Sequence, residues 1–304
     1  MNNVSKYCAI SAMLLCTTTI SAKVIPFNSQ EWNITGDGSM DLLNKKSQLT
    51  TYKGKKALYL AAGGNAVLNN SKFLNGTIEY DVIFPQKRGF VGVMWRMQDN
   101  ENFEEFYMRP HQSGNPDANQ YTPVYNGVSG WQLYYGKQFS VAYKYPFDEW
   151  FHVKIAVSGE NAEIYIKDMK KPSLIVNLKR EIQSGKVGLE VAGNPVLKFT
   201  GAYFANFDYT PLDHVKIKES PIKVVTPSHT ILDWKVSNAF SKNVLEDEYK
   251  IDNSMTDELK WIDAKTDNRG ILNFASVSKI SKEKNTIFAK IKFYSEKEHL
   301  NSTH

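Results

Sequence analysis

The sequence contains only two cysteines, Cys8 and Cys16, and both fall within the first 22 residues. From Lys23 onward there is no thiol for a disulfide, a nucleophile or a zinc ligand. The chain also has no histidine spacing typical of zinc, no glycine-rich phosphate loop and no G-x-S-x-G elbow. A region without disulfides must be stabilised by its hydrophobic core, which a chain of 304 residues is long enough to form.

A strong excess of one charge is absent as well. The 37 basic and 32 acidic residues leave a net charge of +5, and no dense block of lysine and arginine interleaves with the aromatic residues. Binding to nucleic acid is therefore not expected. Beyond the N-terminus no run is apolar enough for a transmembrane helix, and 42% hydrophobic and 23% charged residues are typical of a soluble globular protein.

The N-terminus has the pattern of a secretory signal peptide over residues 1–22. Lys6 supplies the positive charge, Cys8–Ile20 is apolar but too short to span a bilayer, and Ser21-Ala22 provides a small-residue cleavage site. This pattern predicts a secreted or periplasmic protein. The alternative is a lipoprotein signal with Cys16 as the lipidated residue of an outer-membrane lipoprotein, although Leu15 stands where a small residue is expected.

Aromatic residues are what the chain has in excess, and they concentrate between residues 103 and 151. Fourteen fall in these 49 residues, where even spacing of the 38 in the chain would place about 6. The fourteen are Phe103, Phe106, Tyr107, Tyr121, Tyr125, Trp131, Tyr134, Tyr135, Phe139, Tyr143, Tyr145, Phe147, Trp150 and Phe151. Either they form the core of a β-sandwich or some of them bind a ligand.

A polar stretch inside this cluster, His111–Gly130, is predicted to be a long loop, and Trp131–Tyr134 a strand after it. Long loops without secondary structure of their own are often functional. Aromatic rings stack on the apolar face of a sugar, and planar polar side chains hydrogen-bond its hydroxyls. The combination favours an oligo- or polysaccharide as the partner.

Alternating apolar and polar residues in short runs predict an all-β protein. In Gly76–Phe84, for example, Ile78, Tyr80 and Val82 fall on one face of an extended strand. Turns rich in Gly, Asn and Pro separate the runs, and no window has a convincing helical period, so we expect an antiparallel β-sandwich. The predicted strands are Gly76–Phe84, Phe90–Met97, Phe103–Pro110, Phe151–Ser158, Asn161–Lys167, Lys186–Val191 and Lys198–Tyr209.

The sandwich domain is predicted to cover residues 23–210. Residues 211–230 contain three prolines among charged residues and are predicted to be a linker. Residues 231–304 are predicted to form a partial C-terminal β-domain, with strand-like pieces at Gly270–Ser276 and Thr286–Tyr294. Its core is weak for a domain of about 75 residues, so we expect further domains beyond His304.

Residues from about Phe73 to Tyr209 resemble the concanavalin A-like lectin/glucanase jelly roll. Within that fold they look similar to the laminin-G-like and 3-keto-disaccharide-hydrolase-type domains of secreted bacterial proteins. The segments that carry the resemblance are GTIEYDVIF, GFVGVMWRMQDNENFEEFYMRPH, EWFHVKIAV with AEIYIKD, and KVGLEVAG with FANFDY. The resemblance implies a concanavalin A-like antiparallel β-sandwich (jelly roll). It leaves the activity open, because lectins, adhesion modules and hydrolases share this fold.

Glucanases of this family use two carboxylates two residues apart on a strand and a third, the acid/base, three residues further on. Alternate residues share a strand face, so these carboxylates line one groove. Glu79 and Asp81 match the first two positions, but Phe84 stands at the third and cannot transfer a proton. The glucanase carboxylate motif is therefore incomplete, and Glu79 and Asp81 are predicted to be solvent-facing strand residues.

Strand parity selects the candidate ligand-binding residues. In Phe90–Met97 the face that carries Trp95 is predicted to be core, which would point Arg96 to the open, concave face. Tyr107, Arg109 and His111 share one face of the next strand, so we expect all four to line one groove. The planar guanidinium suits paired hydroxyls or a carboxylate. For both arginines a surface ion pair is the alternative.

The predicted loop adds further candidates. Asn115, Asp117, Gln120 and Tyr121 are expected to make polar contacts with the ligand, and Trp131 to offer an aromatic platform. The catalytic residues are unknown. His111 with Asp117 as its carboxylate partner is the combination suited to acid/base catalysis, and a purely structural histidine is the alternative.

No cofactor is expected, apart from a structural calcium ion that the oxygen-rich stretch Asp99-Asn100-Glu101-Asn102 is suited to hold; a plain turn is the alternative. We expect a secreted protein that binds a glycan on the concave face of its sandwich. The alternatives are a glycan hydrolase of the 3-keto-disaccharide-hydrolase type and a laminin-G-like adhesion or structural module. The sequence therefore leaves open whether the protein is an enzyme.

Overall fold

The computed structural model describes residues 24–218, 231–244, 256–257 and 259–292. The predicted signal peptide with Cys8 and Cys16, residues 219–230 of the predicted linker and the C-terminal residues 293–304 lie outside this range. Among the described residues, no helix is both long and apolar enough to cross a membrane.

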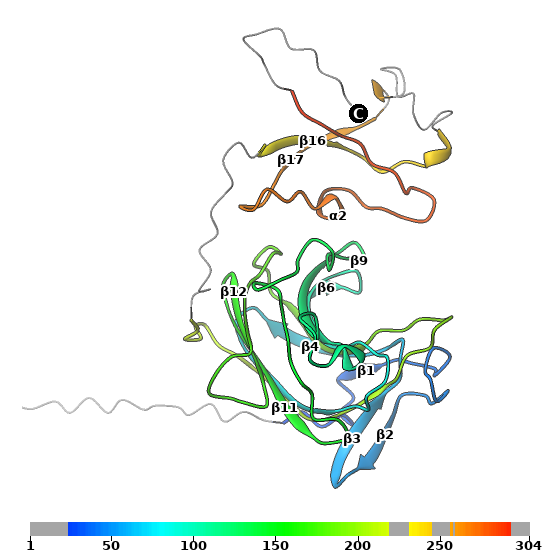
Figure 1. The fold of residues 1–304 in the computed structure, drawn as a ribbon, viewed down its shortest axis with the longest axis vertical. Helices are drawn as coiled ribbons and strands as arrows, with labels where there is room; N and C mark the ends of the chain where they lie inside the picture. The colour runs from blue at the N-terminus through cyan, green and yellow to red at the C-terminus, as the bar shows by residue number, and fades with distance from the viewer. Residues whose placement is uncertain (1–23, 219–230, 245–255, 258, 293–304) are drawn as a thin grey trace, which may run out of the picture.

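The first of two large antiparallel sheets has eight strands in the order β1-β4-β14-β6-β7-β8-β10, with the short β9 paired to β8 (Figure 1). Its strands are β1 (Trp32–Ile34), β4 (Gly64–Phe73), β6 (Val91–Asp99), β7 (Asn102–Met108), β8 (Asn119–Tyr125), β9 (Val128–Ser129), β10 (Ser140–Val141) and β14 (Gly185–Val191). A single turn of 3-10 helix, η1 (Pro110–Gln112), follows β7.

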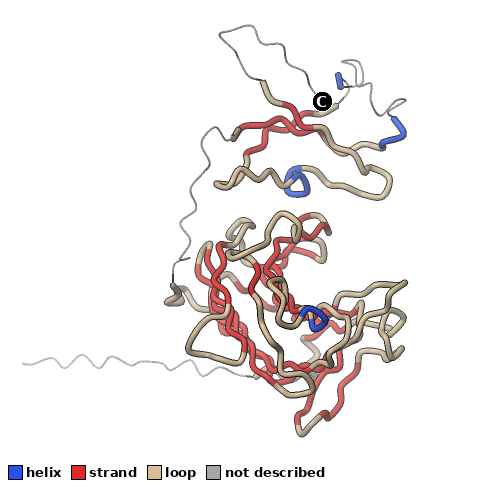
Figure 2. Tube along the Cα trace, viewed as in Figure 1, coloured by secondary structure: helices blue, strands red, loops and turns tan. Residues whose placement is uncertain are grey.

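The second sheet has seven strands in the order β13-β12-β11-β5-β15-β3-β2 and packs against the first (Figure 2). Its strands are β2 (Gln48–Tyr52), β3 (Lys55–Leu60), β5 (Gly76–Ile83), β11 (Phe151–Ser158), β12 (Asn161–Ile166), β13 (Leu174–Asn177) and β15 (Ala202–Pro211). The two antiparallel sheets confirm the all-β sandwich that the sequence pattern and the resemblance imply.

The core lies between the two sheets and follows the predicted alternation. Ile78, Tyr80 and Val82 of β5 are fully buried and pack in one cluster with Val93 and Trp95 of β6. Burying an aliphatic or aromatic side chain of this kind contributes about 1.5–3 kcal/mol. All seven predicted strands are present, with boundaries shifted by a few residues.

The prediction of a continuous loop over His111–Gly130 is wrong in its second half. Residues 119–125 form β8, whose residues 119–124 pair with β7, and residues 128–129 form β9. Asn119, Gln120 and Thr122 are buried on this strand. A half-buried strand is predicted from apolar residues at every second position. In β8 polar residues occupy buried positions, so this alternation is missing from the sequence.

The predicted strand at Trp131–Tyr134 is also wrong, because these residues form a turn. The N–H groups of Leu133 and Tyr134 both donate to the carbonyl of Gly130, at 2.9 and 3.0 Å. The ring of Tyr134 covers Gly130 so closely that a Cβ there would lie 2.7 Å from it. The turn therefore depends on a glycine at position 130.

A smaller antiparallel sheet of three strands, in the order β17-β16-β18, follows the sandwich. It consists of β16 (Asp233–Ser237), β17 (Trp261–Lys265) and β18 (Ala289–Lys290), accompanied by η2 (Lys242–Val244) and the short helix α2 (Phe274–Val277). The predicted strand at Gly270–Ser276 is wrong. The Asn273 side chain accepts a hydrogen bond from the N–H of Ala275 and starts α2 there.

Glu79 and Asp81 lie on the face of the second sheet that is turned away from the core. The prediction that both face solvent is wrong for Asp81, which is 8% exposed and accepts a hydrogen bond from Asn206 Nδ2 at 2.6 Å. His152 lies across from them on β11, with Nδ1 2.8 Å from Asp81 Oδ1 and Nε2 3.1 Å from Glu79 Oε2. Lys55 and Lys154 complete the ion pairs. Both carboxylates are thus neutralised by their neighbours.

The hydrogen bonds to Asp81 and then to Glu79 raise the pKa of His152 to about 9. When folding raises the pKa of a group, the protonated group stabilises the folded state. For His152 this contribution is complete below the pKa of an unfolded histidine, about 6.5, and is lost as the pH rises through the folded pKa of about 9. His152→Gln should therefore lower the free energy of unfolding by about 1 kcal/mol at pH 6, a value reduced for partial solvent exposure. At pH 10 the difference from the wild type should nearly vanish.

Urea unfolding between pH 6 and pH 10 measures this difference. Lys154→Gln, which removes a neighbouring ion pair to Glu79, is the matched control and should cost about the same at pH 6 and pH 9. A cost of His152→Gln that does not change with pH would mean that the histidine is neutral in the folded protein.

Candidate functional site

A pocket of about 450 Å³ opens on the face of the eight-stranded sheet that is turned away from the second sheet. We call it the open-face pocket. It is lined by Arg88, Phe90, Glu105, Tyr107, Arg109, His111, Gln112, Asp117, Ser129, Trp131, Glu190 and Ala192. Five of the nine predicted ligand-binding residues are among these, namely Tyr107, Arg109, His111, Asp117 and Trp131.

Strand register explains why side chains from distant parts of the sequence meet here. Glu105 and Tyr107 alternate on β7, while Glu190 lies on β14, and Gly92 of β6 pairs with both Tyr107 and Glu190. Because Gly92 has no side chain, the side chains of Tyr107 and Glu190 on the neighbouring strands can extend over its backbone. A Cβ at Gly92 would lie 3.3 Å from Glu105 Oε1, so a side chain there would crowd one of the carboxyls that line the pocket.

Arg109 is buried and its guanidinium is held on two sides. Nη1 donates to the carbonyl of Asp117 at 2.7 Å and to its carboxylate at 3.3 Å. Nη2 donates to the Tyr107 hydroxyl and to Gln120 Oε1, both at 2.8 Å. These bonds place a fixed positive charge at the wall of the pocket.

Gln120 lies behind this wall and uses every hydrogen-bonding position of its amide. Oε1 accepts from Arg109 and, at 3.0 Å, from the Tyr107 hydroxyl, while Nε2 donates to the carbonyls of Trp131, at 2.7 Å, and Tyr134. A side-chain amide has two donors and two acceptor sites, so none is left for a ligand. Gln120 therefore links Arg109 and Tyr107 to the turn that carries Trp131.

Trp131 stands on that turn at the mouth of the pocket with 48% of its surface exposed. Large exposed indoles are uncommon unless something covers them. Its backbone carbonyl is fixed by Gln120, whereas no described residue makes a ring contact with it. The ring is available to stack on a ligand.

His111 follows β7 and packs edge-on against the ring of Phe90, with the ring centroids 5.3 Å apart. Its Nδ1 accepts a long bond, 3.5 Å, from the N–H of Gly89. Burial, together with the nearby charges of Arg88 and Arg109, lowers its pKa. Neutral His111 would therefore carry its proton on Nε2, as a donor rather than a cation.

Glu105 and Glu190 form the acidic side of the pocket. Glu105 is 7% exposed, and no hydrogen bond to its carboxyl is found within the described part of the chain. Burial, and then the charge of Glu190, raises its pKa well above the usual range, and burial raises the pKa of Glu190 to about 7. Each carboxyl disfavours ionisation of the other, so the pair loses its two protons in separate steps.

Three predicted site residues lie elsewhere, and Arg96 is the clearest correction. Arg96 has φ +49°, at the point where the pairing of β6 with β7 shifts register. This irregularity breaks the parity that the prediction used. The side chain is 1% exposed and donates to the carbonyls of Leu74, at 2.8 Å, and Gly159, at 2.7 Å. Arg96 therefore connects the turns that contain Leu74 and Gly159, and does not face a ligand.

Tyr121 and Asn115 are also outside the pocket lining. Tyr121 faces the core between the sheets and donates to the carboxylate of Glu104. Exposed Asn115 donates from Nδ2 to the side chain of Gln112 in its own turn. The change from loop to strand at residue 119 decides the outcome for Tyr121, because pairing with β7 turns Tyr121 to the core and Gln120 to the opposite face.

The sequence reasoning missed Glu105, Glu190 and Phe90 as parts of the site. Glu105 shares a strand face with Tyr107 and Arg109, so parity could have identified it. Glu190 alternates with the core residues Leu189 and Val191, which assigns it to an outer face. The missing information was the order of strands, which brings β14 next to β6 across 80 or more residues of sequence.

The stretch proposed for calcium forms a local turn. The carboxylate of Asp99 accepts from the N–H of Glu101 at 2.7 Å and from Asn102 Nδ2 at 3.0 Å. Glu101 pairs with Lys279. Within the described ranges there is no group of three or more His, Cys, Asp or Glu side chains placed to hold a metal ion.

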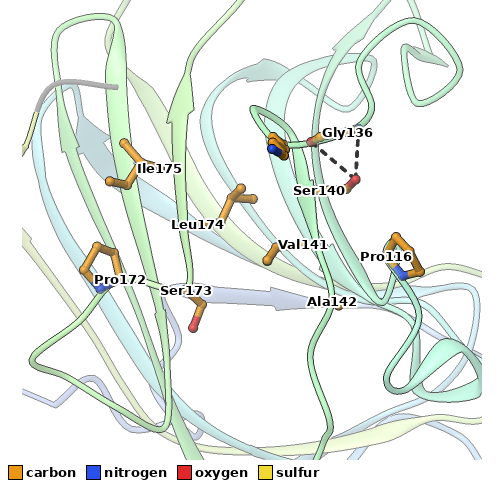
Figure 3. Close-up of a pocket in the computed structure, with 10 residues that line it drawn as sticks. Pro116, Gly136, Ser140, Val141, Ala142, Pro172, Ser173, Leu174 and Ile175 are labelled. Carbon is orange, nitrogen blue, oxygen red and sulfur yellow. Dashed lines mark hydrogen bonds between the residues drawn. The ribbon is translucent and has the colours of Figure 1, made fainter. Parts of the chain in front are cut away.

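A second hollow, of about 560 Å³, lies between edge strands β10 and β13 of the two sheets (Figure 3). Val141, Leu174 and Ile175 give it a mainly apolar lining. The Ser140 hydroxyl is bonded within its own turn, to the N–H and carbonyl of Gly136. With few polar groups converging, this hollow suits a polar ligand less well than the open-face pocket.

No family model and no curated protein matches the sequence. Solved structures that are similar include a carbohydrate-binding module, CBM66, from Bacillus subtilis, with 15% identity and a TM-score of 0.42, covering 59% of this chain and 95% of that one. A β-glucanase from Bacillus licheniformis has 14% identity and a TM-score of 0.45, covering 64% and 100%.

A laminarinase from Flavobacterium sp. UMI-01 is similar as well, with 11% identity and a TM-score of 0.43 over 62% of this chain and 99% of that one. Identities of 15% or less express a likeness of fold alone. What the open-face pocket binds has to be inferred from its own side chains.

Proposed function

We propose that the protein binds a carbohydrate in the open-face pocket. The observation that carries the proposal is an exposed indole, Trp131, beside planar polar groups that are fixed before any ligand arrives. Sugars present both an apolar ring face and many hydroxyls, and this pocket offers a partner for each. A pocket of about 450 Å³ lies within the usual range for small-ligand sites.

The polar groups of the pocket support hydroxyl recognition over binding of an anion. Arg109 already donates to Asp117, Tyr107 and Gln120, so its charge is largely satisfied within the protein. Glu105 and Glu190 add oxygens that accept from hydroxyls, and whichever carboxyl is ionised repels a carboxylate or sulfate group. We therefore infer a neutral glycan. The signal-peptide pattern of residues 1–22 supports a secreted or periplasmic location, where extracellular polysaccharides are met.

Replacing Trp131 tests the binding proposal directly. Trp131→Ala should weaken the affinity for the retained glycan roughly tenfold, because a stacked aromatic ring contributes on the order of 1 kcal/mol or more. The measurement is affinity electrophoresis in gels that contain neutral or acidic polysaccharides, followed by titration calorimetry with oligosaccharides of the glycan that retards the protein.

Tyr135→Ala is the matched control for this variant. Tyr135 is on the same turn and 71% exposed, but it does not line the pocket. Its loss should leave the affinity unchanged within twofold. If no glycan retards the wild-type protein, the proposal is wrong, and a protein-binding adhesion module becomes the better account of the fold.

Hydrolysis of the bound glycan is a second candidate function, favoured by the Glu105 and Glu190 pair. One protonated carboxyl can donate its proton to the oxygen that leaves the anomeric carbon. The other, ionised, can take a proton from the water that attacks that carbon. One C–O bond breaks, one C–O bond forms, and the pair ends with the same single proton. A 3-keto disaccharide is one substrate class to include.

Glu105→Gln and Glu190→Gln should each lower the rate of glycan cleavage by about 100-fold or more, while affinity changes far less. The wild-type rate should fall on both sides of a maximum near neutral pH, because the reaction requires one proton in the pair. Release of reducing ends from the retained glycan and from 3-keto disaccharides measures the rate. Glu101→Gln, on the exposed turn between β6 and β7, is the control.

Equal rates for the glutamine variants and the wild type would assign any observed cleavage to other groups. Binding without cleavage of any substrate would leave the protein as a glycan-binding module and remove this second candidate.

A further inference from the structure

The turn that carries Trp131 is held from two sides, and the second side is the C-terminal region. Arg269, in the segment between β17 and α2, reaches the sandwich there. Its guanidinium lies 4.4 Å from the centre of the Phe139 ring and 5.3 Å from that of Tyr134, and Nη2 donates to the carbonyl of Leu133 at 3.5 Å. In Figure 1 this segment and α2 lie on the side of the small sheet that faces the sandwich.

Arg269 is itself oriented within its own turn. The carboxylate of Asp267 accepts from the backbone N–H groups of Arg269, at 2.9 Å, and Ile271, at 3.0 Å, and pairs with the Arg269 side chain at 3.4 Å. Only 20% of the Arg269 side chain is exposed. A cation over aromatic rings gains strength when water is excluded in this way.

An unbroken series of contacts leads from Arg269 to the pocket. Arg269 touches the Tyr134 ring and the Leu133 carbonyl, and the carbonyls of Tyr134 and Trp131 in the same turn accept from Gln120. Gln120 accepts from Arg109 in the pocket wall. The turn is therefore fixed by Gln120 from within the sheet and by Arg269 from outside.

We propose that Arg269 is a positioning residue for the open-face pocket, through which the C-terminal three-stranded sheet clamps the turn that presents Trp131. Arg269 does not line the pocket, so it acts on a ligand only through the turn. The effect on glycan affinity rests on the proposed function. The clamp itself concerns the turn and is testable without a ligand.

Further contacts join the C-terminal region to the sandwich, and two of them lie away from the clamped turn and provide a control. Lys279 pairs with Glu101, and Asn126 Nδ2 donates to the carbonyl of Ala275 at 2.8 Å. Both lie at the turns that follow β6 and β8, and neither touches residues 130–139. Lys279→Ala therefore loosens the junction without releasing the clamped turn.

Hydrogen–deuterium exchange of the full chain tests the clamp directly. Arg269→Ala should speed exchange of the amides in residues 130–139 by about tenfold, since local opening becomes easier when a stabilising contact is removed. Lys279→Ala should leave exchange in these residues unchanged. Arg269→Lys keeps a cation near the rings and should restore most of the protection. Unchanged exchange in Arg269→Ala, or equal effects of Arg269→Ala and Lys279→Ala, would overturn the proposal.

A double-mutant cycle connects the clamp to binding. Arg269→Ala should weaken glycan affinity several-fold in the wild-type background and have almost no effect when Trp131 is already alanine, because both changes remove the same stacking. Fully additive losses would overturn the route through Trp131. If exchange responds as expected but the wild-type protein binds no glycan, the clamp stands and the proposed function fails.

Discussion

The side-chain amide of Gln120 is the constraint on which the rest of the site depends. It is 2% exposed and makes two donor and two acceptor bonds, to groups that come from β7 and from the Trp131 turn. A buried amide that lost one of these partners would leave a polar group without compensation, at a cost of about 1–3 kcal/mol. The pattern also fixes which end of the amide is oxygen, because only an oxygen can accept from both Arg109 and Tyr107.

The two faces of the sandwich use carboxylates in opposite ways. On the second sheet, Glu79 and Asp81 are paired with His152 and with lysines, and these partners hold the pKa of both carboxyls below the usual range. On the first sheet, no cation among the described residues forms an ion pair with Glu105 or Glu190, so burial dominates and raises the pKa of both. Residue type alone does not separate these cases, since all four carboxyls stand on strands.

Much of the fold follows from local pattern, whereas the site follows from it only in part. Alternation assigned Trp95 to the core and Tyr107 and Arg109 to one outer face, because strand geometry has a strict period of two. The same rule failed for Arg96, where a left-handed residue and a register shift break the period. It also failed at β8, where buried polar side chains remove the apolar signal, and it could not place Glu190 beside Glu105, since strand order is a long-range property.

Gly92, paired with both Tyr107 and Glu190, gives these pocket residues room because it has no side chain. Its neighbours approach so closely that a methyl group there would lie 3.2 Å from the Phe106 carbonyl and 3.3 Å from the Tyr107 Cβ. A side chain at this position would therefore press on Glu105 and Tyr107, whose side chains line the pocket. Variation at this one position would displace a carboxyl and the hydroxyl that Arg109 contacts, whereas Trp131 stands on a separate turn and would keep its place.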